Sequence, residues 1–262
     1  MKNRSFLKSA ILAACSGALT AAIAAPASAG GLFDTEPEQS RLYVSVFGGA
    51  SFLTDSTFNG VSNPEVGVPA PTGIAGAPLS VELDADTGFT FGGAIGYQFG
   101  FKYLKIFHPR VEIEVSYLSN NIGEGSFNGG SQTFSGEQDT LFVYINNYSD
   151  IKFHEDQKFV PYIGGGFGLG FVDSDVSYFP ATASAPVFGV FGDDTAFAGH
   201  VAVGATYALS DKLELYSEGR YFRVNNVDLE RRFIGGGADL FVGDVESRID
   251  GFTATGGLRY TF

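Results

Sequence analysis

The chain ends in the stretch Ile249-Asp250-Gly251-Phe252-Thr253-Ala254-Thr255-Gly256-Gly257-Leu258-Arg259-Tyr260-Thr261-Phe262, which decides the fold. From Phe252 onward, one parity holds apolar or small residues: Phe252, Ala254, Gly256, Leu258, Tyr260 and Phe262. The other parity holds polar or small residues: Thr253, Thr255, Gly257, Arg259 and Thr261. Successive side chains of a strand point to opposite faces, so the pattern predicts a strand with one apolar and one polar face. An alternation of this length is typical of a strand in a membrane barrel.

The same alternation recurs earlier in the chain. Further segments that show it are Arg41–Leu53, Thr87–Phe99, Pro109–Ser119, Thr140–Phe153, Phe159–Val172, Thr195–Leu209 and Leu213–Val224. Each is long enough to cross the hydrocarbon core as a tilted strand, which takes about 9–11 residues. Short connections (Gly100–His108, His154–Lys158 and Ser210–Lys212) alternate with long ones rich in Gly, Ser, Pro and Asp. The sequence therefore predicts an all-β fold: an eight-stranded antiparallel up-and-down transmembrane β-barrel with four long extracellular loops and three short periplasmic turns.

The composition agrees with this class. The 262 residues include 36 Gly, and 15% are aromatic. Only 17% are charged, against roughly 25% in an ordinary soluble domain. A hydrophobic content of 44% excludes intrinsic disorder. No run of about 18 apolar residues follows the N-terminus, which excludes a helical membrane protein.

The N-terminus has the features of a secretory signal peptide. Three basic residues precede an Ala-rich apolar stretch, and Ala27-Ser28-Ala29 supplies an A-x-A cleavage site. We therefore expect residues 1–29 to be a cleaved signal peptide, 30–40 a short periplasmic lead and 41–262 the barrel. The alternative is a lipoprotein signal at Leu12-Ala13-Ala14-Cys15, although Lys8 leaves a short hydrophobic core before that site.

Cysteine content and charge narrow the possible partners. Cys15 is the only cysteine, so cleavage after Ala29 leaves no disulfide or thiol chemistry. The formal net charge is −13, and the signal peptide contains basic residues but no acids. Binding of nucleic acid by simple attraction is therefore disfavoured. No cofactor is predicted.

The polar parity places charged side chains inside the barrel. They are Arg110, Glu112, Glu114, Glu214, Glu218, Arg220 and Arg259. An eight-stranded barrel is just wide enough for side chains to fill. Its third and seventh strands lie roughly opposite each other, so Glu114 is expected to reach Arg220 across the lumen. Unpaired charges there are costly, so we interpret the set as a structural ion-pair plug. A gated polar channel lined by the same residues is the alternative.

Two further features concern the barrel wall. Gly164, Gly166, Gly168 and Gly170 share the inward parity and leave room for bulky partners such as Arg and Tyr. Aromatic residues gather where strands meet the short turns: Phe99, Phe153, Phe159, Tyr207, Tyr260 and Phe262. They predict an aromatic girdle at a membrane interface. With the faces inverted, the same alternation would describe a soluble lipid-carrying barrel.

Four segments of the chain carry a resemblance to a known family: Leu42–Gly49, Pro109–Glu114, Val160–Gly166 and Gly257–Phe262. With them the chain resembles the OmpA-type and opacity-like surface antigens, the eight-stranded outer-membrane barrels also called the small porin family. The resemblance implies location in the outer membrane of a Gram-negative bacterium, among outer-membrane lipids and lipopolysaccharide. Leu258, Tyr260 and Phe262 are similar to the C-terminal signal read by the barrel-assembly machinery. The family includes adhesins, structural anchors and weak pores.

Catalytic and metal chemistry have little support in the sequence. His108 and His154 fall at predicted turns, where solvated roles are expected. His200 points inward and would need a partner such as Thr255 or Ser217 to act as a base in a lipid-modifying enzyme. Asp84-Ala85-Asp86 and Asp173-Ser174-Asp175 lack a complete calcium-loop pattern, so no metal site is predicted.

Three hypotheses follow. The first is a plugged barrel that is not an enzyme and acts in outer-membrane structure or surface interaction, with an extracellular partner at its loops. The second is a small porin that passes ions or small solutes. The third and weakest is a lipid-modifying enzyme.

Overall fold

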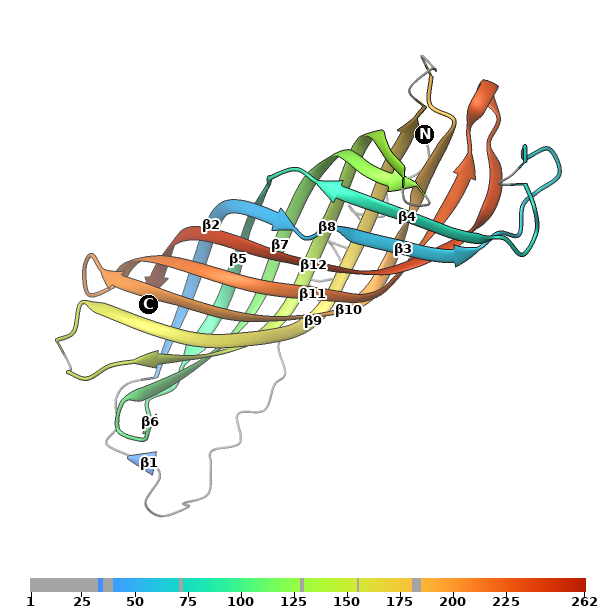
Figure 1. Cartoon of the computed structure of the whole chain (residues 1–262). Helices are drawn as coiled ribbons and strands as arrows, with labels where there is room; N and C mark the ends of the chain where they lie inside the picture. Colours follow the sequence, from blue (N-terminus) through green and yellow to red (C-terminus); the bar gives the residue numbers. More distant parts are fainter. Residues whose placement is uncertain (1–32, 35–39, 71–72, 128–129, 155, 181–184) are drawn as a thin grey trace.

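The computed structural model describes residues 33–34, 40–70, 73–127, 130–154, 156–180 and 185–262. This part of the chain folds almost wholly into antiparallel strands (Figure 1). The elements are β1 (Phe33–Asp34), β2 (Arg41–Leu53), β3 (Ser56–Val61), β4 (Pro78–Ala85), β5 (Gly88–Gln98), β6 (Lys102–Tyr103), β7 (Phe107–Phe127), β8 (Gly130–Ile151), β9 (Phe159–Phe179), β10 (Phe188–Ala208), β11 (Leu213–Phe233), the 3₁₀ turn η1 (Gly235–Gly237) and β12 (Leu240–Thr261). The predicted signal peptide, residues 1–29, lies outside the described residues, as does most of the predicted lead.

The strands close into a ring. In the order β2, β5, β7, β8, β9, β10, β11 and β12, each strand pairs antiparallel with the next. The last and first strands then pair from Thr261↔Tyr43 to Gly251↔Leu53, which closes the ring. This register confirms the predicted eight-stranded antiparallel up-and-down barrel. Among the described residues, no helix is long and apolar enough to cross a membrane.

The strands continue well beyond the predicted segments. Past Leu53 the place of β2 in the ring is taken by β3, which pairs with β12 and β4. β4 pairs with β7 and leads into β5, so a second ring stands on the first. We call the ring containing β2 and β5 the basal half, and the ring containing β3 and β4 the distal half. The prediction of four long loops was therefore wrong in extent, because most of these stretches are strand.

The outward face changes character at one level of the barrel. On β9 the outward residues are apolar from Phe159 to Phe171 and acidic at Asp173 and Asp175. At ~3.3 Å per residue and a tilt of about 40°, the apolar part spans about 30 Å along the barrel axis. The same change occurs on β11 between Tyr221 and Arg223, and on the other strands at Phe52/Thr54, Phe89/Thr87, Tyr117/Ser119, Leu141/Asp139, Phe197/Thr195 and Phe252/Asp250. We call this level the boundary.

Below the boundary the outer surface consists of exposed apolar side chains. Val46, Ile95, Phe167 and Val203 are each more than half exposed. A continuous apolar surface of this kind is unusual for a soluble monomer and marks contact with lipid or another apolar phase. The faces are therefore those of a membrane barrel and not those of the soluble lipid carrier considered above.

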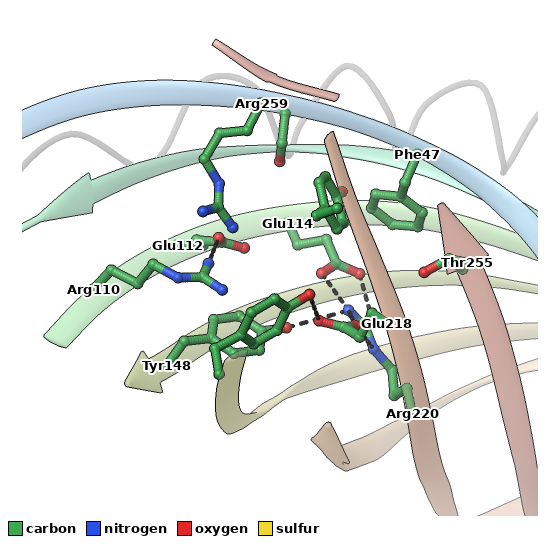
Figure 2. A pocket seen from close by; sticks show the side chains of 12 residues that line it. Phe47, Arg110, Glu112, Glu114, Tyr148, Glu218, Arg220, Thr255 and Arg259 are labelled. Carbon is green, nitrogen blue, oxygen red and sulfur yellow. Dashed lines mark hydrogen bonds and ion pairs between the residues drawn. The ribbon is translucent and has the colours of Figure 1, made fainter. Parts of the chain in front are cut away.

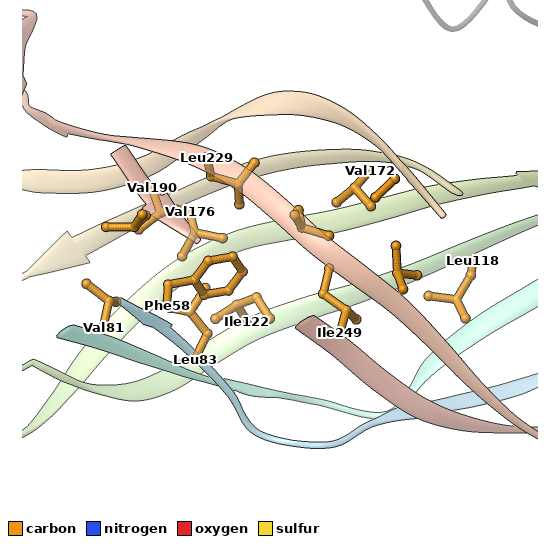
Figure 3. Packing of buried hydrophobic residues seen from close by; sticks show 14 of the residues in the cluster. Phe58, Val81, Leu83, Leu118, Ile122, Val172, Val176, Val190, Leu229 and Ile249 are labelled. Carbon is orange, nitrogen blue, oxygen red and sulfur yellow. The ribbon is translucent and has the colours of Figure 1, made fainter. Parts of the chain in front are cut away.

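The interior changes character in the opposite sense. The basal half encloses charged and hydroxyl-bearing side chains, whereas the distal half encloses a mostly apolar core of aliphatic and aromatic residues (Figure 3). Phe58, Val176 and Val245 lie at its centre and are almost fully buried. The distal half is thus built like a soluble barrel, with apolar residues inside and acids outside.

This arrangement predicts that the two halves can be loosened separately. Phe58 is fully buried in the distal core, so Phe58→Ala should cost about 3–5 kcal/mol. Hydrogen exchange should become faster in β3 and β4 and stay unchanged in β2 and β5. Thr57→Ala is the matched control, because that side chain points outward. Uniform acceleration over both halves would contradict a separately packed distal core.

Candidate functional site

The basal interior is organised around Arg220 of β11 (Figure 2). Its Nη1 and Nη2 donate to Glu114 Oε1 and Oε2 on β7 at 2.7 and 2.8 Å. Its Nε donates to Glu218 Oε1 at 3.0 Å. The bidentate geometry suits the planar guanidinium, and hydrogen bonds between ionised groups are about twice as strong as neutral ones. Arg220 thus binds Glu114 across the barrel and Glu218 on its own strand, as the inward parity of these residues indicated.

The Glu114 carboxylate is held from two more sides. Ser116 Oγ donates to Oε1 and Asn146 Nδ2 donates to Oε2, both at 2.9 Å. Because the Asn146 amide nitrogen faces Glu114, its Oδ1 faces His200 Nε2 at 2.9 Å and accepts a hydrogen bond from it. The carboxylate therefore has donors from three strands. A buried charge needs such compensation if it is to remain ionised.

A second cluster surrounds Arg110 of β7. Its Nε donates to Asp150 Oδ1 on β8 at 3.0 Å, and its Nη1 pairs with Glu112. The guanidinium lies 4.1 Å from the Tyr148 ring centroid and 4.7 Å from that of Tyr162, within cation–π range. The charge is thus enclosed on its edges by carboxylates and on its faces by aromatic rings.

A third pair lies toward the base of the barrel. Arg259 Nη1 donates to Glu214 Oε2 at 3.0 Å. Its guanidinium lies 4.9 Å from the Tyr43 ring, whose hydroxyl donates to Glu112 at 2.6 Å. Glu214 is the most exposed of the predicted lumen residues, with 30% of its side chain accessible. All the predicted inward charges therefore lie in the interior or at its mouth, and each is in an ion pair.

The glycines of β9 make this packing possible. A Cβ on Gly164 would come within 2.3 Å of the Tyr148 ring. A Cβ on Gly166 would come within 2.0 Å of Asn146 and 2.6 Å of His200. The space that side chains at these glycines would take is thus occupied by side chains of β8 and β10. Tyr148, Tyr162 and Asp150 were not predicted to belong to the network. The even parity of Thr140–Phe153 could have indicated those on β8.

The three histidines lie in different surroundings. The proton on His200 Nε2 is used by Asn146, and the ring packs edge-on against Tyr144 at 4.7 Å between centroids. Ser217 points outward on β11 and is exposed, so it is no partner for His200. His108 was predicted to be a solvated turn residue, which is wrong, because it lies in β7 and is buried. His154 is exposed in its turn, as predicted.

The interior leaves little open space. Two cavities between these side chains, one at the Arg220 cluster and one beside Phe142 and Phe222, have volumes of about 10 Å³ each. Such a volume admits roughly one water molecule. Above the second cavity, the aliphatic distal core begins. The described part of the basal interior is therefore densely packed with polar side chains.

Aromatic residues line both edges of the outer apolar surface. At the basal edge Phe153, Phe159 and Phe262 are each more than half exposed. A second set at the boundary was not predicted, although it follows the same outward parity: Phe52, Phe89, Phe91, Tyr117, Phe197, Tyr221 and Phe252. Phe91 and Tyr117 pack against each other at 5.5 Å between centroids. Two girdles that enclose an apolar band are the arrangement of transmembrane barrels.

Acidic residues meet directly above the boundary. Asp139 of β8, Asp173 of β9 and Asp193 of β10 are cross-strand partners, as are Glu137 and Asp175. We call these five residues the acidic ladder. Burial and then repulsion from Asp139 and Asp193 raise the pKa of Asp173 above its usual range. Like charges opposite each other destabilise a sheet, so the ladder is kept at a cost in stability.

A smaller acidic group lies on β4 and on the segment just before β3. Carboxylate oxygens of Asp55, Glu82 and Asp84 lie within 4.8 Å of one another. Burial and then repulsion from Asp55 and Glu82 raise the pKa of Asp84. The sequence grouped Asp84 with Asp86, whereas in the structure Asp84 lies close to Glu82, two residues earlier on β4, and to Asp55, just before β3. Oxygen ligands at this spacing are compatible with a hard divalent cation.

The closed ring with an apolar outer band and a polar core defines the class as a transmembrane-type β-barrel. The chain matches no known family profile and no curated protein. Among solved structures it is similar to the outer membrane protease OmpT from Escherichia coli, at 13% identity, TM-score 0.48, covering 87% of this chain and 100% of that chain. It is also similar to the outer membrane protein OprG from Pseudomonas aeruginosa, at 11% identity, TM-score 0.44, covering 84% and 95%. A third is Neisserial surface protein A, at 15% identity, TM-score 0.37, covering 86% and 100%.

The buried ion pairs predict a large effect for the loss of one partner. Arg220→Met leaves Glu114 and Glu218 as uncompensated charges, which should cost about 3–5 kcal/mol of unfolding free energy. Urea unfolding of the refolded barrel in lipid vesicles measures this. Adding Glu114→Gln to Arg220→Met should restore part of the loss. Arg232→Met removes an exposed ion pair and should cost at most about 1 kcal/mol. Equal losses in the two single variants would contradict the account.

The acidic ladder predicts a pH-dependent stability. The raised pKa means that folding favours the protonated form of Asp173, so its contribution is most favourable at low pH and is lost as the pH rises through the folded-state pKa. Asp173→Asn should therefore stabilise the barrel at about pH 7 and have little effect at about pH 3. The unfolding midpoint in urea measures both. Asp211→Asn, in an exposed turn, is the control, and a stabilisation independent of pH would contradict the argument.

Proposed function

We propose that the chain is an integral outer-membrane β-barrel of a Gram-negative bacterium whose interior is blocked and whose distal half projects from the cell surface. The apolar outer band of about 30 Å matches the hydrocarbon thickness of a bilayer. The resemblance to the OmpA-type and opacity-like group supports the same location. The distal half would then stand in water, which agrees with its acidic outer face.

One observation carries the proposal that the barrel does not conduct. Two different obstructions stand in series along the axis. The first is the ion-paired cluster of Arg220, Glu114 and Glu218, and the second is the aliphatic core around Phe58 and Val176. An ion would have to break the first and then pass a core in which most buried side chains are apolar and in which the buried Arg231 repels cations. A porin needs a continuous polar path, and the apolar cluster around Phe58 and Val176 among the described residues does not favour one.

We propose a role in outer-membrane structure or in interaction at the cell surface, not catalysis. The arrangement of His200 with Asn146 supports this, since the Nε2 proton is already engaged. The projecting half offers a rigid sheet wall with acidic side chains and hairpin ends to an extracellular partner.

The C-terminal residues support assembly by the barrel-assembly machinery. Leu258, Tyr260 and Phe262 share the outward face of β12 and the residue after it, and each is more than 40% exposed. They are therefore available for recognition before the ring closes against β2. We propose that these three side chains form the assembly signal.

Conductance tests the blocked interior. The refolded chain in a planar bilayer should show no stable openings at any applied voltage. Stable openings in the wild type that change in size with Glu218→Ala or Arg220→Ala would contradict the proposal and favour the small porin.

Location is tested independently of conductance. The protein should stay in the membrane fraction during extraction with urea or carbonate and dissolve only in detergent. Release without detergent would contradict the membrane assignment. Lipid A that is altered in cells overproducing the chain would favour the enzyme instead.

A further inference from the structure

Two arginines stand on the outer face of the barrel at or just above the boundary. Arg223 of β11 and Arg248 of β12 have 42% and 65% of their side chains exposed. Both follow the outward parity of their strands. The buried arginines of the basal half form ion pairs inside the barrel, whereas the side chains of these two point away from it.

A single carboxylate holds the two guanidiniums side by side. Arg223 Nε donates to Asp250 Oδ1 at 2.6 Å, and Arg248 Nε lies 3.1 Å from Asp250 Oδ2. Arg223 Nη2 also donates to the Tyr221 hydroxyl at 2.9 Å. Among the described residues no acceptor is bound by Nη1 of Arg223 or by the terminal nitrogens of Arg248. The three side chains carry a net charge of +1 and keep donors directed outward.

The surface below the arginines is suited to acyl chains. Tyr221 and Phe252 pack against each other at 5.1 Å between centroids, one position below Arg223 and Asp250. Below this aromatic pair the outward residues are small. They form a strip across β11, β12 and β2, defined by Gly219, Ala254, Ala50, Gly256 and Gly48. A side chain added at Gly219 would meet nothing within 4 Å, so the surface is open there.

The charge at the boundary differs between the two sides of the barrel. On β8, β9 and β10 the same level carries the acidic ladder. An anion near the boundary is therefore repelled on that side and attracted to Arg223 and Arg248 on the other. Guanidinium groups bind phosphate oxygens with paired, directed hydrogen bonds. Each basic residue near an anionic membrane surface adds about a factor of five in affinity.

We propose that Arg223 and Arg248 bind a phosphate group of an anionic lipid in the outer leaflet, with the acyl chains of that lipid on the Tyr221–Phe252 pair and the small-residue strip. The inference rests on the proposed outer-membrane location, because only there does the boundary coincide with lipid headgroups. The barrel would then have one specific lipid-binding site on an apolar surface that elsewhere contacts any lipid. In an outer membrane this phosphate belongs to lipopolysaccharide.

Native mass spectrometry of the refolded barrel in detergent tests the site, with bisphosphorylated lipid A as the probe. The wild type should retain lipid A, and Arg223→Gln with Arg248→Gln should lower the apparent affinity on the order of tenfold. Arg232→Gln is the matched control, because Arg232 is also outward and paired with acids but lies in the distal half. It should leave the affinity unchanged. Dephosphorylated lipid A should bind the wild type and the double variant equally.

The outcomes separate the site from the location. Folding of every variant is checked by the gel mobility of unheated samples, and insertion by resistance to carbonate. If the barrel inserts and the double variant retains lipid A as well as the wild type, the lipid site is refuted and the location stands. If the wild type does not insert, both the proposed location and this inference are refuted. An equal loss in Arg232→Gln would also overturn the site, because the effect would then be one of total charge.

Discussion

The hydrogen-bonded closure between β12 and β2 is the constraint on which the other features depend. In a bilayer, backbone groups have no water to bind, so a sheet that spans it must have no open edge. Once Thr261 to Gly251 are paired with Tyr43 to Leu53, each of the eight strands of the basal ring has two neighbours and its parity is fixed. Outward positions then stay outward along the whole strand, so the residue type at these positions must change where the surroundings change from lipid to water. On β9 that change is from Phe171 to Asp173 on the outside and from Gly170 to Val172 on the inside.

The same constraint explains the unusual interior. A narrow ring cannot hold large side chains on all strands at one level, so β9 contributes glycines where β8 and β10 contribute Tyr148, Asn146 and His200. The arginines are enclosed by carboxylates and rings from opposite walls, which ties together strands far apart in sequence. Buried ion pairs of this kind add little net stability compared with apolar packing. Their value here lies in filling the lumen while fixing the position of the strands around it.

Much of the basal half could be predicted from the sequence, because alternation reports burial there directly. The contact of Arg220 with Glu114 was predicted from their inward parity and from the opposite places of the third and seventh strands in an eight-stranded ring. The distal half was missed for a physical reason. Asp173, Ser174 and Asp175 have the composition of a loop, and the alternation continues through Val172 and Val176 with inverted polarity. The contacts of Tyr148 and Asp150 with Arg110, and the burial of His108, depend on the register between neighbouring strands. That register cannot be read from the sequence of one strand. The boundary girdle followed the outward parity and could have been found.

The most direct test of the account is the position of the polarity change on one strand. The sequence has no cysteine after Cys15, so single cysteines placed at outward positions of β9 can carry a nitroxide label in the mature chain. Collision with oxygen reports lipid, and collision with a water-soluble nickel complex reports water. The account predicts oxygen-accessible labels at residues 163, 167, 169 and 171 and nickel-accessible labels at residues 173 and 175. Labels that are nickel-accessible along the whole of β9 would contradict a barrel embedded in a bilayer up to the boundary.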